Sequence, residues 1–215
     1  STKIIEIRGD RNHSFPGMTQ PEPLAHNLKD LMSTVTSQNA DIGIATDGDA
    51  DRLGIVDETG RYLNTLDVFA LLCLHQLDVL GRRGPLVRSI TMTSMVDQLG
   101  EMYGVPVFDT PVGFKYLGPV MMREDALMAG EESGGYAFRG NIPERDGILS
   151  GLILLEMMIK TGKSVSGLLQ MLQEKVGPHH YDRWDLKMNE SQRKIVETRL
   201  ETVCPTTLAN RQVRK

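Results

Sequence analysis

The sequence predicts an α/β fold, and two observations lead to that class. Short runs of β-branched and apolar residues alternate along the chain with stretches whose apolar residues recur at helical spacing. The 215 residues are 40% hydrophobic and 24% charged, which is enough chain and enough apolar side chain for a buried core. A disordered protein would be poorer in hydrophobic residues, so that class is excluded. The expected organisation is one large domain or two ordinary ones.

The first quarter of the chain is expected to hold three strands and one amphipathic helix. Residues 9–21 are polar and marked by glycine and proline, which predicts a loop. The helix is predicted over residues 23–36, because leucines and a valine recur there at intervals of three and four. The strands are predicted at residues 4–7, 41–45 and 53–56, with a turn at 57–60.

The rest of the chain alternates between helices and short strands. Asn64 and Thr65 open a strongly apolar helix over residues 66–80, which Gly81 ends. Strands are predicted at residues 85–90, 105–108, 126–129 and 181–186. Helices are predicted at residues 95–103 after a Ser94 cap, about 114–123, 147–160, 165–176 after a Ser164 cap, and 191–201. Gly177-Pro178 is a plausible hinge, and no closing element is predicted after residue 201, which suggests a chain cut from a longer protein.

Charge and cysteine content exclude several function classes. The 24 basic and 28 acidic residues give a net charge of −4 without a basic cluster, so we expect no nucleic-acid partner. No apolar run approaches the roughly 20 residues of a membrane span, and we expect no membrane partner. Two cysteines cannot form a disulfide framework, so we expect a cytoplasmic protein.

An acidic loop lies between the strands predicted at 41–45 and 53–56. Asp47, Asp49 and Asp51 alternate with small residues, and in an extended backbone this spacing points three carboxylates to one side. Their mutual repulsion is relieved by a cation, and hard oxygen ligands select Mg²⁺ or Ca²⁺. The alternative is a solvated acidic turn, since Asp and Gly are common turn residues.

Two known acidic motifs compare poorly with this loop. An EF-hand requires glycine at its sixth position and helical flanks, but Arg52 occupies that position and the flanks read as strands. A phosphatase of the haloacid dehalogenase type begins with Asp-x-Asp, as here, but usually has Thr or Val where Asp51 stands. Arg52 itself favours a phosphate beside the metal, because guanidinium binds phosphate bidentately. The alternative is that Arg52 only balances the charge of the loop.

Two further loops carry candidate residues. Residues 130–135 place Glu131 and Ser133 among glycines, and such acceptors and hydroxyls suit a polyhydroxylated ligand. By itself this pattern is also typical of a tight turn. Lys115 follows a strand-to-helix turn and can hold a phosphate or donate a proton if it is partly buried, although a solvated surface lysine is the plainer interpretation.

Taken together, the three loops resemble the phosphohexomutase superfamily, the phosphoglucomutases and phosphomannomutases. The resemblance runs from the helix start at Pro21-Glu22-Pro23-Leu24, through the loop at 46–54, to the helix after Asp146-Gly147. It implies mixed-sheet α/β domains: one complete third domain at 63–177, flanked by the C-terminal part of the second domain at 1–62 and the start of the fourth at 178–215. The remaining domains of the parent enzyme would then be its partners.

The resemblance also implies a reaction. A phosphoserine and a bisphosphate intermediate move a phosphoryl group between C1 and C6 of a hexose phosphate, with glucose 1- or 6-phosphate favoured and a hexose 1,6-bisphosphate as activator. Asp47, Asp49 and Asp51 would hold Mg²⁺. Arg52 would contact the phosphoryl group, and Lys115 matches a candidate general acid or base. Glu131 and Ser133 would bind two sugar hydroxyls.

The sequence departs from the family pattern in two respects. None of the five histidines follows a serine, so the Ser-His-Asn-Pro loop that carries the family nucleophile is not in this chain, nor is the phosphate loop of the fourth domain. We therefore expect the isolated 215 residues to be inactive. The alternative function is a non-catalytic module, derived from a mutase, that binds a sugar phosphate or a metal. A metal-dependent phosphatase is a further, minor alternative.

Overall fold

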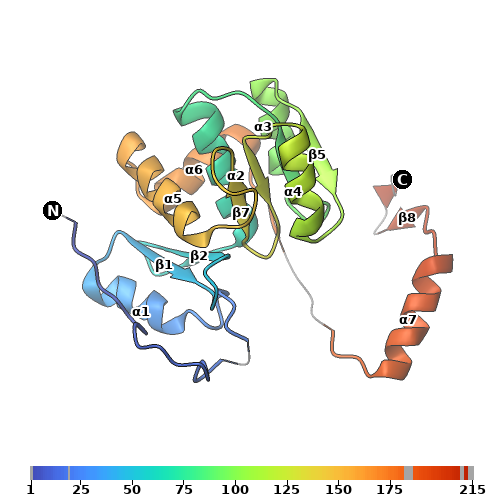
Figure 1. Ribbon diagram of the computed structural model, residues 1–215, viewed down its shortest axis with the longest axis horizontal. Coiled ribbons are helices and arrows are strands. Elements are labelled where there is room, and N and C mark those ends of the chain that lie inside the picture. The colour runs from blue at the N-terminus through green and yellow to red at the C-terminus, as the bar shows by residue number, and fades with distance from the viewer. Residues whose placement is uncertain (1, 19, 182–185, 209–210, 213–215) are drawn as a thin grey trace. The chain divides into compact units, whose positions relative to one another are not determined.

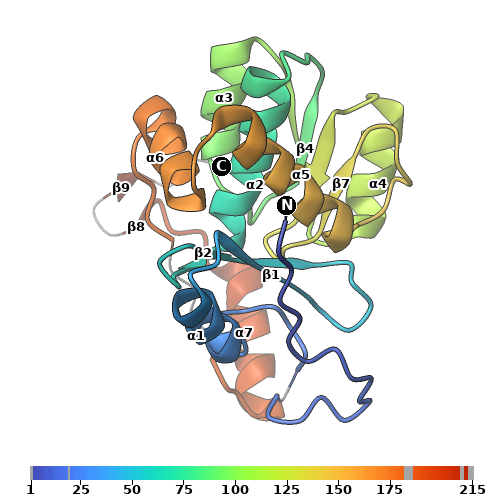
Figure 2. The same cartoon turned by 90° about the vertical axis from the view of Figure 1, so that its left-hand side faces the viewer.

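The computed structural model describes residues 2–18, 20–181, 186–208 and 211–212. The chain divides into two compact units, Ser1–His179 and His180–Lys215, which are described separately. The first unit contains two sheets with helices on both sides of each (Figures 1 and 2). The α/β class with antiparallel and mixed sheets is therefore confirmed.

The first sheet is a three-stranded antiparallel sheet in the order β1-β2-β3. It consists of β1 (Ile42–Thr46), β2 (Leu53–Asp57) and the short β3 (Tyr62–Leu63). Every residue of the central strand β2 is buried. Helix α1 (Lys29–Gln38) covers one face of this sheet and α5 (Gly147–Thr161) the other (Figure 2). The β1–β2 connection therefore emerges from a well-packed hairpin.

The second sheet has the order β5-β4-β6-β7. Strand β4 (Leu86–Ser89) runs parallel to both β5 (Val107–Thr110) and β6 (Met128–Gly130). Strand β7 (Tyr136–Phe138) turns back antiparallel to β6. The carboxyl ends of the three parallel strands consequently lie at one edge, which is where α/β proteins place their ligands.

The two faces of the second sheet bury separate clusters, because alternate strand residues point to opposite sides. Leu86 belongs to the cluster around α2 (Thr65–Leu74), whereas its neighbour Val87 packs with α4 (Phe114–Arg123). Figure 1 shows α2 and α4 on opposite sides of the strands. Helix α2 is buried on all sides, which explains why its sequence is apolar throughout.

Three more helical segments complete the first unit. Helix α2 continues into a π-helical turn, η1 (His75–Val79), and α3 (Met95–Tyr103) and α6 (Val165–Val176) pack against α2. Polar contacts tie these segments together: the Tyr103 hydroxyl donates to Asp78 (2.7 Å), and the Lys175 ammonium lies 3.3 Å from the same carboxylate.

The second unit contains α7 (Glu190–Thr202) and a small hairpin of β8 (Thr207–Leu208) and β9 (Arg211–Gln212). Asn189 and Gln192 form a reciprocal capping box at the start of α7. The expectation that no element closes the chain is therefore wrong. The predicted strand at 181–186 lies largely outside the described residues.

Two predicted elements near the N-terminus are wrong or shorter than expected. Residues 4–7 form no strand, and Ile4 is 86% exposed, because no described strand pairs with this segment. The helix predicted over 23–36 begins only at Lys29. The Asn27 side chain donates to the carbonyls of Gln20 and Glu22 (both 2.8 Å), and these bonds hold the preceding residues in turns.

The other elements exist close to their predicted positions, with small differences. Strands β5 and β6 begin two residues later than predicted, and β3 and β7 were not predicted at all, since each is only two or three residues long. The caps at Asn64 and Ser164 are confirmed, as each side chain accepts a backbone N–H of the first turn. Ser94 precedes α3 without such a bond.

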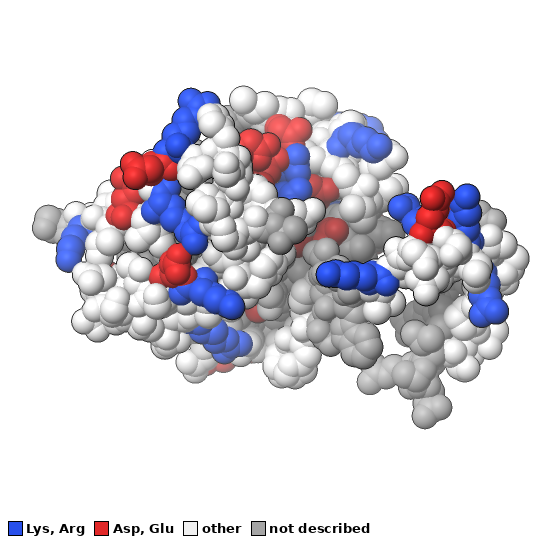
Figure 3. Space-filling model, turned by 90° about the horizontal axis from the view of Figure 1, so that it is seen from below, with Lys and Arg blue, Asp and Glu red and all other residues white. Residues whose placement is uncertain are grey.

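The surface carries charges of both signs. On the face drawn in Figure 3, acidic side chains lie among the basic ones. Of the two cysteines, Cys73 is buried in α2 and Cys204 is exposed. Among the described helices, none combines the length and the apolarity that a membrane crossing needs.

Candidate functional site

The acidic loop connects β1 to β2, and its ends are held by the last pair of the hairpin, Thr46 and Leu53. Within the loop the Ala50 N–H donates to the Asp47 carbonyl (3.3 Å), and the Asp47 carboxylate accepts the Arg52 N–H (3.1 Å). Ala50 adopts a left-handed conformation with φ of 61°. The loop is therefore a tight turn and not the extended segment that the spacing suggested.

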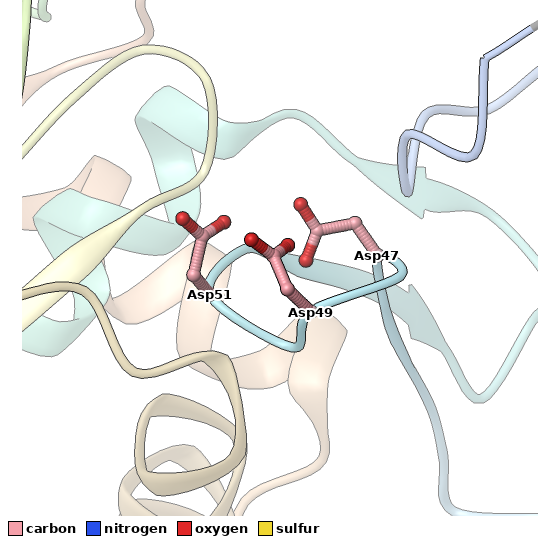
Figure 4. A group of neighbouring side chains, drawn as sticks. All are labelled: Asp47, Asp49 and Asp51. Atoms are coloured by element: carbon pink, nitrogen blue, oxygen red, sulfur yellow. The ribbon is translucent and has the colours of Figure 1, made fainter.

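This turn brings the three aspartates together (Figure 4). One carboxylate oxygen from each of Asp47, Asp49 and Asp51 lies within 4.8 Å of the other two. Burial raises the pKa of Asp51 to about 6; the Arg145 guanidinium opposes this shift, while repulsion from Asp47 and Asp49 adds to it. The convergence of the three carboxylates on one point was correctly predicted, although a turn produces it.

The three carboxylates fit a divalent cation with oxygen ligands. Asp51 Oδ1 is buried and accepts no hydrogen bond from the described residues. This oxygen is therefore available as a metal ligand. Asp49, in contrast, is exposed, so the group opens to solvent on one side. A cation of the Mg²⁺ or Ca²⁺ type would satisfy the unpaired oxygen and relieve the repulsion.

Arg52 is engaged within the protein. Its guanidinium contacts Glu22 (3.0 Å) and lies 3.6 Å from Asp47 and 3.7 Å from Asp51. Its Nε is buried without a hydrogen-bond partner in the described residues. This arrangement matches the charge-balancing alternative, because Nε, although it makes no hydrogen bond, is the atom that faces the Asp47 and Asp51 carboxylates. Glu22 as the partner of Arg52 was not predicted, because the two are distant in sequence.

The glycine loop follows β6 and precedes β7. Glu131 is buried, with 4% of its surface exposed, and its Oε1 accepts the Gly113 N–H (2.8 Å). Burial raises the pKa of the Glu131 carboxyl, and Arg145 and the Gly113 N–H partly offset that effect. Ser133 Oγ is buried and makes no hydrogen bond within the described part of the chain. Both predicted sugar-binding residues therefore lie in one loop, and one of them has an unused hydroxyl.

The acidic loop and the glycine loop are joined through their backbones. Arg52 and Gly135 form an isolated antiparallel bridge, and the Leu53 N–H donates to the Gly134 carbonyl (3.0 Å). Gly134 has φ of 95°, a conformation that glycine adopts without strain. Residues far apart in the sequence thus form one continuous site.

Arg145 links the same two loops through its side chain. Its guanidinium contacts Asp51 (2.6 Å) and lies 3.8 Å from Glu131 and 5.9 Å from the ring of Phe114. No role was predicted for Arg145 from the sequence. The sequence shows only that Arg145 directly precedes Asp146, the cap of α5. It does not show the two carboxylate partners, because they come from distant segments.

Lys115 lies apart from these contacts. It is exposed near the start of α4, and its ammonium lies 5.0 Å from the centre of the Tyr116 ring. Its loop is nevertheless tied to the glycine loop, because Gly113 donates to Glu131. The structure does not bury Lys115, so its role as a proton donor stays a prediction.

Comparison with known proteins identifies the kind of chain to which this site belongs. The family model described as phosphoglucomutase/phosphomannomutase, alpha/beta/alpha domain III, matches residues 66–176. The corresponding model for alpha/beta/alpha domain II matches residues 1–60. Between them they include both the acidic loop and the glycine loop.

Individual relatives are moderately similar. A phosphoglucomutase/phosphomannomutase of Thermococcus kodakarensis is 31% identical over 194 residues, which cover 90% of this chain and 41% of that protein. Phosphoglucomutase 1 of Drosophila melanogaster is 33% identical, covering 79% of this chain and 31% of its own length. A phosphoglucosamine mutase of Nitratidesulfovibrio vulgaris is 35% identical, and the match covers 75% of this chain and 34% of that protein. The chain thus spans about a third to two fifths of these relatives.

Two crystal structures show the same fold. A protein of Thermus thermophilus assigned as a phosphomannomutase has a TM-score of 0.70 at 37% identity, over 73% of this chain and 36% of that one. Parafusin, an exocytosis-sensitive phosphoprotein and phosphoglucomutase of Paramecium, has a TM-score of 0.65 at 25% identity, over 74% and 30%.

Proposed function

This chain belongs to the phosphoglucomutase/phosphomannomutase family, and from that membership we propose that its parent protein moves a phosphoryl group between C1 and C6 of a hexose phosphate. The transfer runs through a phosphoserine and a hexose 1,6-bisphosphate, and the phosphoserine lies in another part of the parent protein. In this proposal residues 1–62 belong to the second domain, 63–177 form the third and 178–215 begin the fourth.

The observation that carries the proposal is the joining of the acidic loop to the glycine loop. Asp47, Asp49 and Asp51 are proposed as the Mg²⁺ ligands, supported by their convergence and by the unpaired oxygen of Asp51. Bound Mg²⁺ supplies positive charge beside the transferred phosphoryl group. The backbone bridge between Arg52 and Gly135 keeps these ligands next to the glycine loop.

The remaining site residues are proposed to bind and orient the hexose phosphate. Glu131 and Ser133 accept from and donate to adjacent sugar hydroxyls, supported by the unused Ser133 hydroxyl. Arg52 is proposed to contact the phosphoryl group through its guanidinium, which lies beside two of the proposed metal ligands, Asp47 and Asp51. Lys115, exposed at the start of α4, is the candidate proton donor and acceptor for the sugar oxygens. A glucose phosphate is proposed as the substrate.

Metal binding is tested by replacing one ligand without changing its size. Asp49→Asn should weaken Mg²⁺ binding to the 215-residue chain by roughly tenfold or more, measured by titration calorimetry. The control is Asp41→Asn, since Asp41 is an exposed carboxylate just before β1 and outside the loop. Equal Mg²⁺ affinities in the two variants would remove the metal assignment.

The activity is tested with a coupled assay that contains glucose 1-phosphate, Mg²⁺ and a hexose 1,6-bisphosphate. We expect turnover by the parent protein and none by the 215 residues alone. Asp49→Asn in the parent should lower the rate roughly 100-fold. Glucosamine and mannose phosphates belong in the same assay, because relatives of similar identity are named phosphoglucosamine mutases.

An intact parent that binds hexose phosphate without turnover would instead be a non-catalytic module, and release of inorganic phosphate would indicate a phosphatase.

A further inference from the structure

Glu132 lies between the two proposed sugar-binding residues, and its own carboxylate is bound by another strand. Its Oε2 accepts hydrogen bonds from the hydroxyls of Ser89 (2.8 Å) and Thr91 (2.5 Å). Its backbone carbonyl accepts a third bond, from the Thr65 hydroxyl at the start of α2 (2.5 Å). The side chain and the main chain of one residue are therefore held by two different elements.

The neighbouring Glu131 has a different set of partners. Its carboxylate accepts the Gly113 N–H after β5 and lies 3.8 Å from Arg145. The hydroxyls that donate to the Glu132 carboxylate are neutral and lie at the end of β4. The two adjacent glutamates thus connect the loop after β6 to the ends of two other strands, one each.

The strand end that Glu132 contacts is itself buried and paired within the sheet. Ser89 is the last residue of β4 and fully buried, and the next residue, Ile90, continues the pairing by donating to the Thr110 carbonyl of β5 (2.9 Å). The Ser89 hydroxyl also lies 3.1 Å from the Thr91 hydroxyl, so the two hydroxyls and the Glu132 carboxylate form one hydrogen-bonded group in which the carboxylate is the charged acceptor. The carboxylate of Glu132 satisfies two hydroxyls at once and so fixes the glycine loop against the carboxyl edge of the parallel strands.

We propose that Glu132 is a positioning residue that holds Glu131 and Ser133 in the orientation that binds a hexose phosphate, while making no contact with the ligand itself. The orientation of Ser133 depends on this anchor, because Ser133 Oγ has no bond of its own in the described residues. This inference rests on the proposed function for the identity of the ligand and for the sugar-binding roles of Glu131 and Ser133. The anchoring itself is a property of the protein alone.

The anchoring is tested first without any ligand, by hydrogen exchange of the amides inside the loop. The Glu131 N–H donates to the Gly135 carbonyl (3.0 Å), and the Gly134 N–H donates to the Glu131 carbonyl (3.1 Å). In Glu132→Met, which keeps the length of the side chain but has no acceptor oxygen, both amides should exchange roughly fivefold faster or more. Glu132→Gln keeps an acceptor and should restore most of the protection.

Two controls show whether faster exchange is confined to the glycine loop and whether it comes from the lost hydrogen bonds. The Leu168 amide of α6, which donates to the carbonyl of the preceding Ser164 cap, should exchange at the same rate in every variant, since it lies outside the loop. Thr91→Val removes one donor at an exposed position and should loosen the same two loop amides, to a smaller extent, without disturbing the fold. Unchanged loop exchange in both Glu132→Met and Thr91→Val would overturn the inference, as would an equal acceleration in α6.

The consequence for the ligand is tested next, by titrating the chain with glucose 6-phosphate and with Mg²⁺ separately. Glu132→Met should weaken glucose 6-phosphate binding roughly fivefold to tenfold and leave Mg²⁺ binding unchanged, with Glu132→Gln close to the wild type. Equal weakening of both ligands would contradict a role confined to the glycine loop. If the wild-type chain binds no hexose phosphate, the proposed sugar site fails in this chain, whereas the exchange rates still decide whether Glu132 anchors the loop.

Discussion

Gly147 shows how one residue without a side chain determines the position of the acidic loop. Its N–H donates to the Ala50 carbonyl (2.9 Å), so the start of α5 lies directly against the loop. A Cβ at this position would lie 2.5 Å from the Arg52 carbonyl oxygen and 2.9 Å from that of Ala50. Both are backbone atoms that cannot rotate away, so any larger residue must displace the loop.

We therefore predict that Gly147→Ala weakens Mg²⁺ binding roughly tenfold, as measured by calorimetry, because the three carboxylates lose their mutual geometry. Gly151→Ala, one turn later on α5, is the matched control. Its Cβ would meet side-chain atoms of Ile44 and Leu53 at 3.1 Å or more, which can adjust. Equal Mg²⁺ affinities in the two variants would show that the close approach of Gly147 does not position the loop.

Arg52 and Arg145 form ion pairs that the sequence alone does not reveal. The position of Arg52 after three aspartates was informative, but its partner Glu22 was not foreseen. Arg145 contacts one carboxylate from each loop, Asp51 and Glu131. Charge pairing over such separations depends on which chain segments meet in space, and spacing in sequence carries no information on that.

At the scale of elements, the turn after β2 is linked to the start of α6. The Glu58 carboxylate accepts the Ser166 hydroxyl through one oxygen and lies 3.3 Å from the Ser166 N–H through the other. Burial alone would raise the pKa of Glu58, but the bonds from Ser166 and Ser164 outweigh it and lower the pKa below its ordinary value. A carboxylate at a helix N-terminus also interacts favourably with the helix dipole.

The sign of the pH dependence follows from that lowered pKa. Stability contributed by Glu58 is present above its unfolded pKa of about 4.5 and is lost as the pH falls through the lower folded value. Glu58→Gln should therefore lower the free energy of unfolding at pH 7 by roughly 0.5 kcal/mol, a modest figure because the group is partly exposed. At about pH 3, below the ordinary pKa, the difference from the wild type should be smaller than at pH 7.

Urea unfolding at the two pH values measures this difference. Glu101→Gln, at an exposed carboxylate of α3, is the control and should change little at either pH. A constant destabilisation of Glu58→Gln at both pH values would mean that the ionised carboxylate is not what links the turn to α6.

For the whole molecule, the buried hydrophobic residues that the structure describes all lie between residues 28 and 176. The described residues of the second unit contribute none. Its apolar residues Ile195, Leu200 and Val203 are 58%, 70% and 56% exposed. Helix α7 is supported by its capping box and by pairs one turn apart, such as Arg193 with Glu197 (2.7 Å). Interactions of this kind stabilise a short helix only marginally.

We predict that a chain ending at His179 keeps the thermal stability of the full 215 residues, with a melting temperature within about 2 °C, because no described core residue is removed. The melting temperatures of both chains are measured by circular dichroism, in the spectral regions sensitive to helix content and to aromatic packing. A fall of more than about 5 °C would show that the second unit contributes to the core of the first.

The sequence by itself was sufficient for the α/β class, for most helices and strands, and for the three loops that carry the candidate site. These features are local: helical spacing, alternation and turn residues act over a few positions, so they can be read along the chain. The predictions that failed rested on local patterns that the tertiary structure overrides. An example is the apolar run at 4–7, which has no described strand to pair with.

Only the tertiary structure decided how those loops meet. The bridge between Arg52 and Gly135, the two contacts of Arg145 and the anchoring of Glu132 by Ser89 and Thr91 all join segments that are distant in sequence. Packing around the buried strand β2 and helix α2 brings these segments within hydrogen-bonding distance. The residue types needed for metal and sugar binding are therefore evident in the sequence, whereas their assembly into one site is a consequence of the fold.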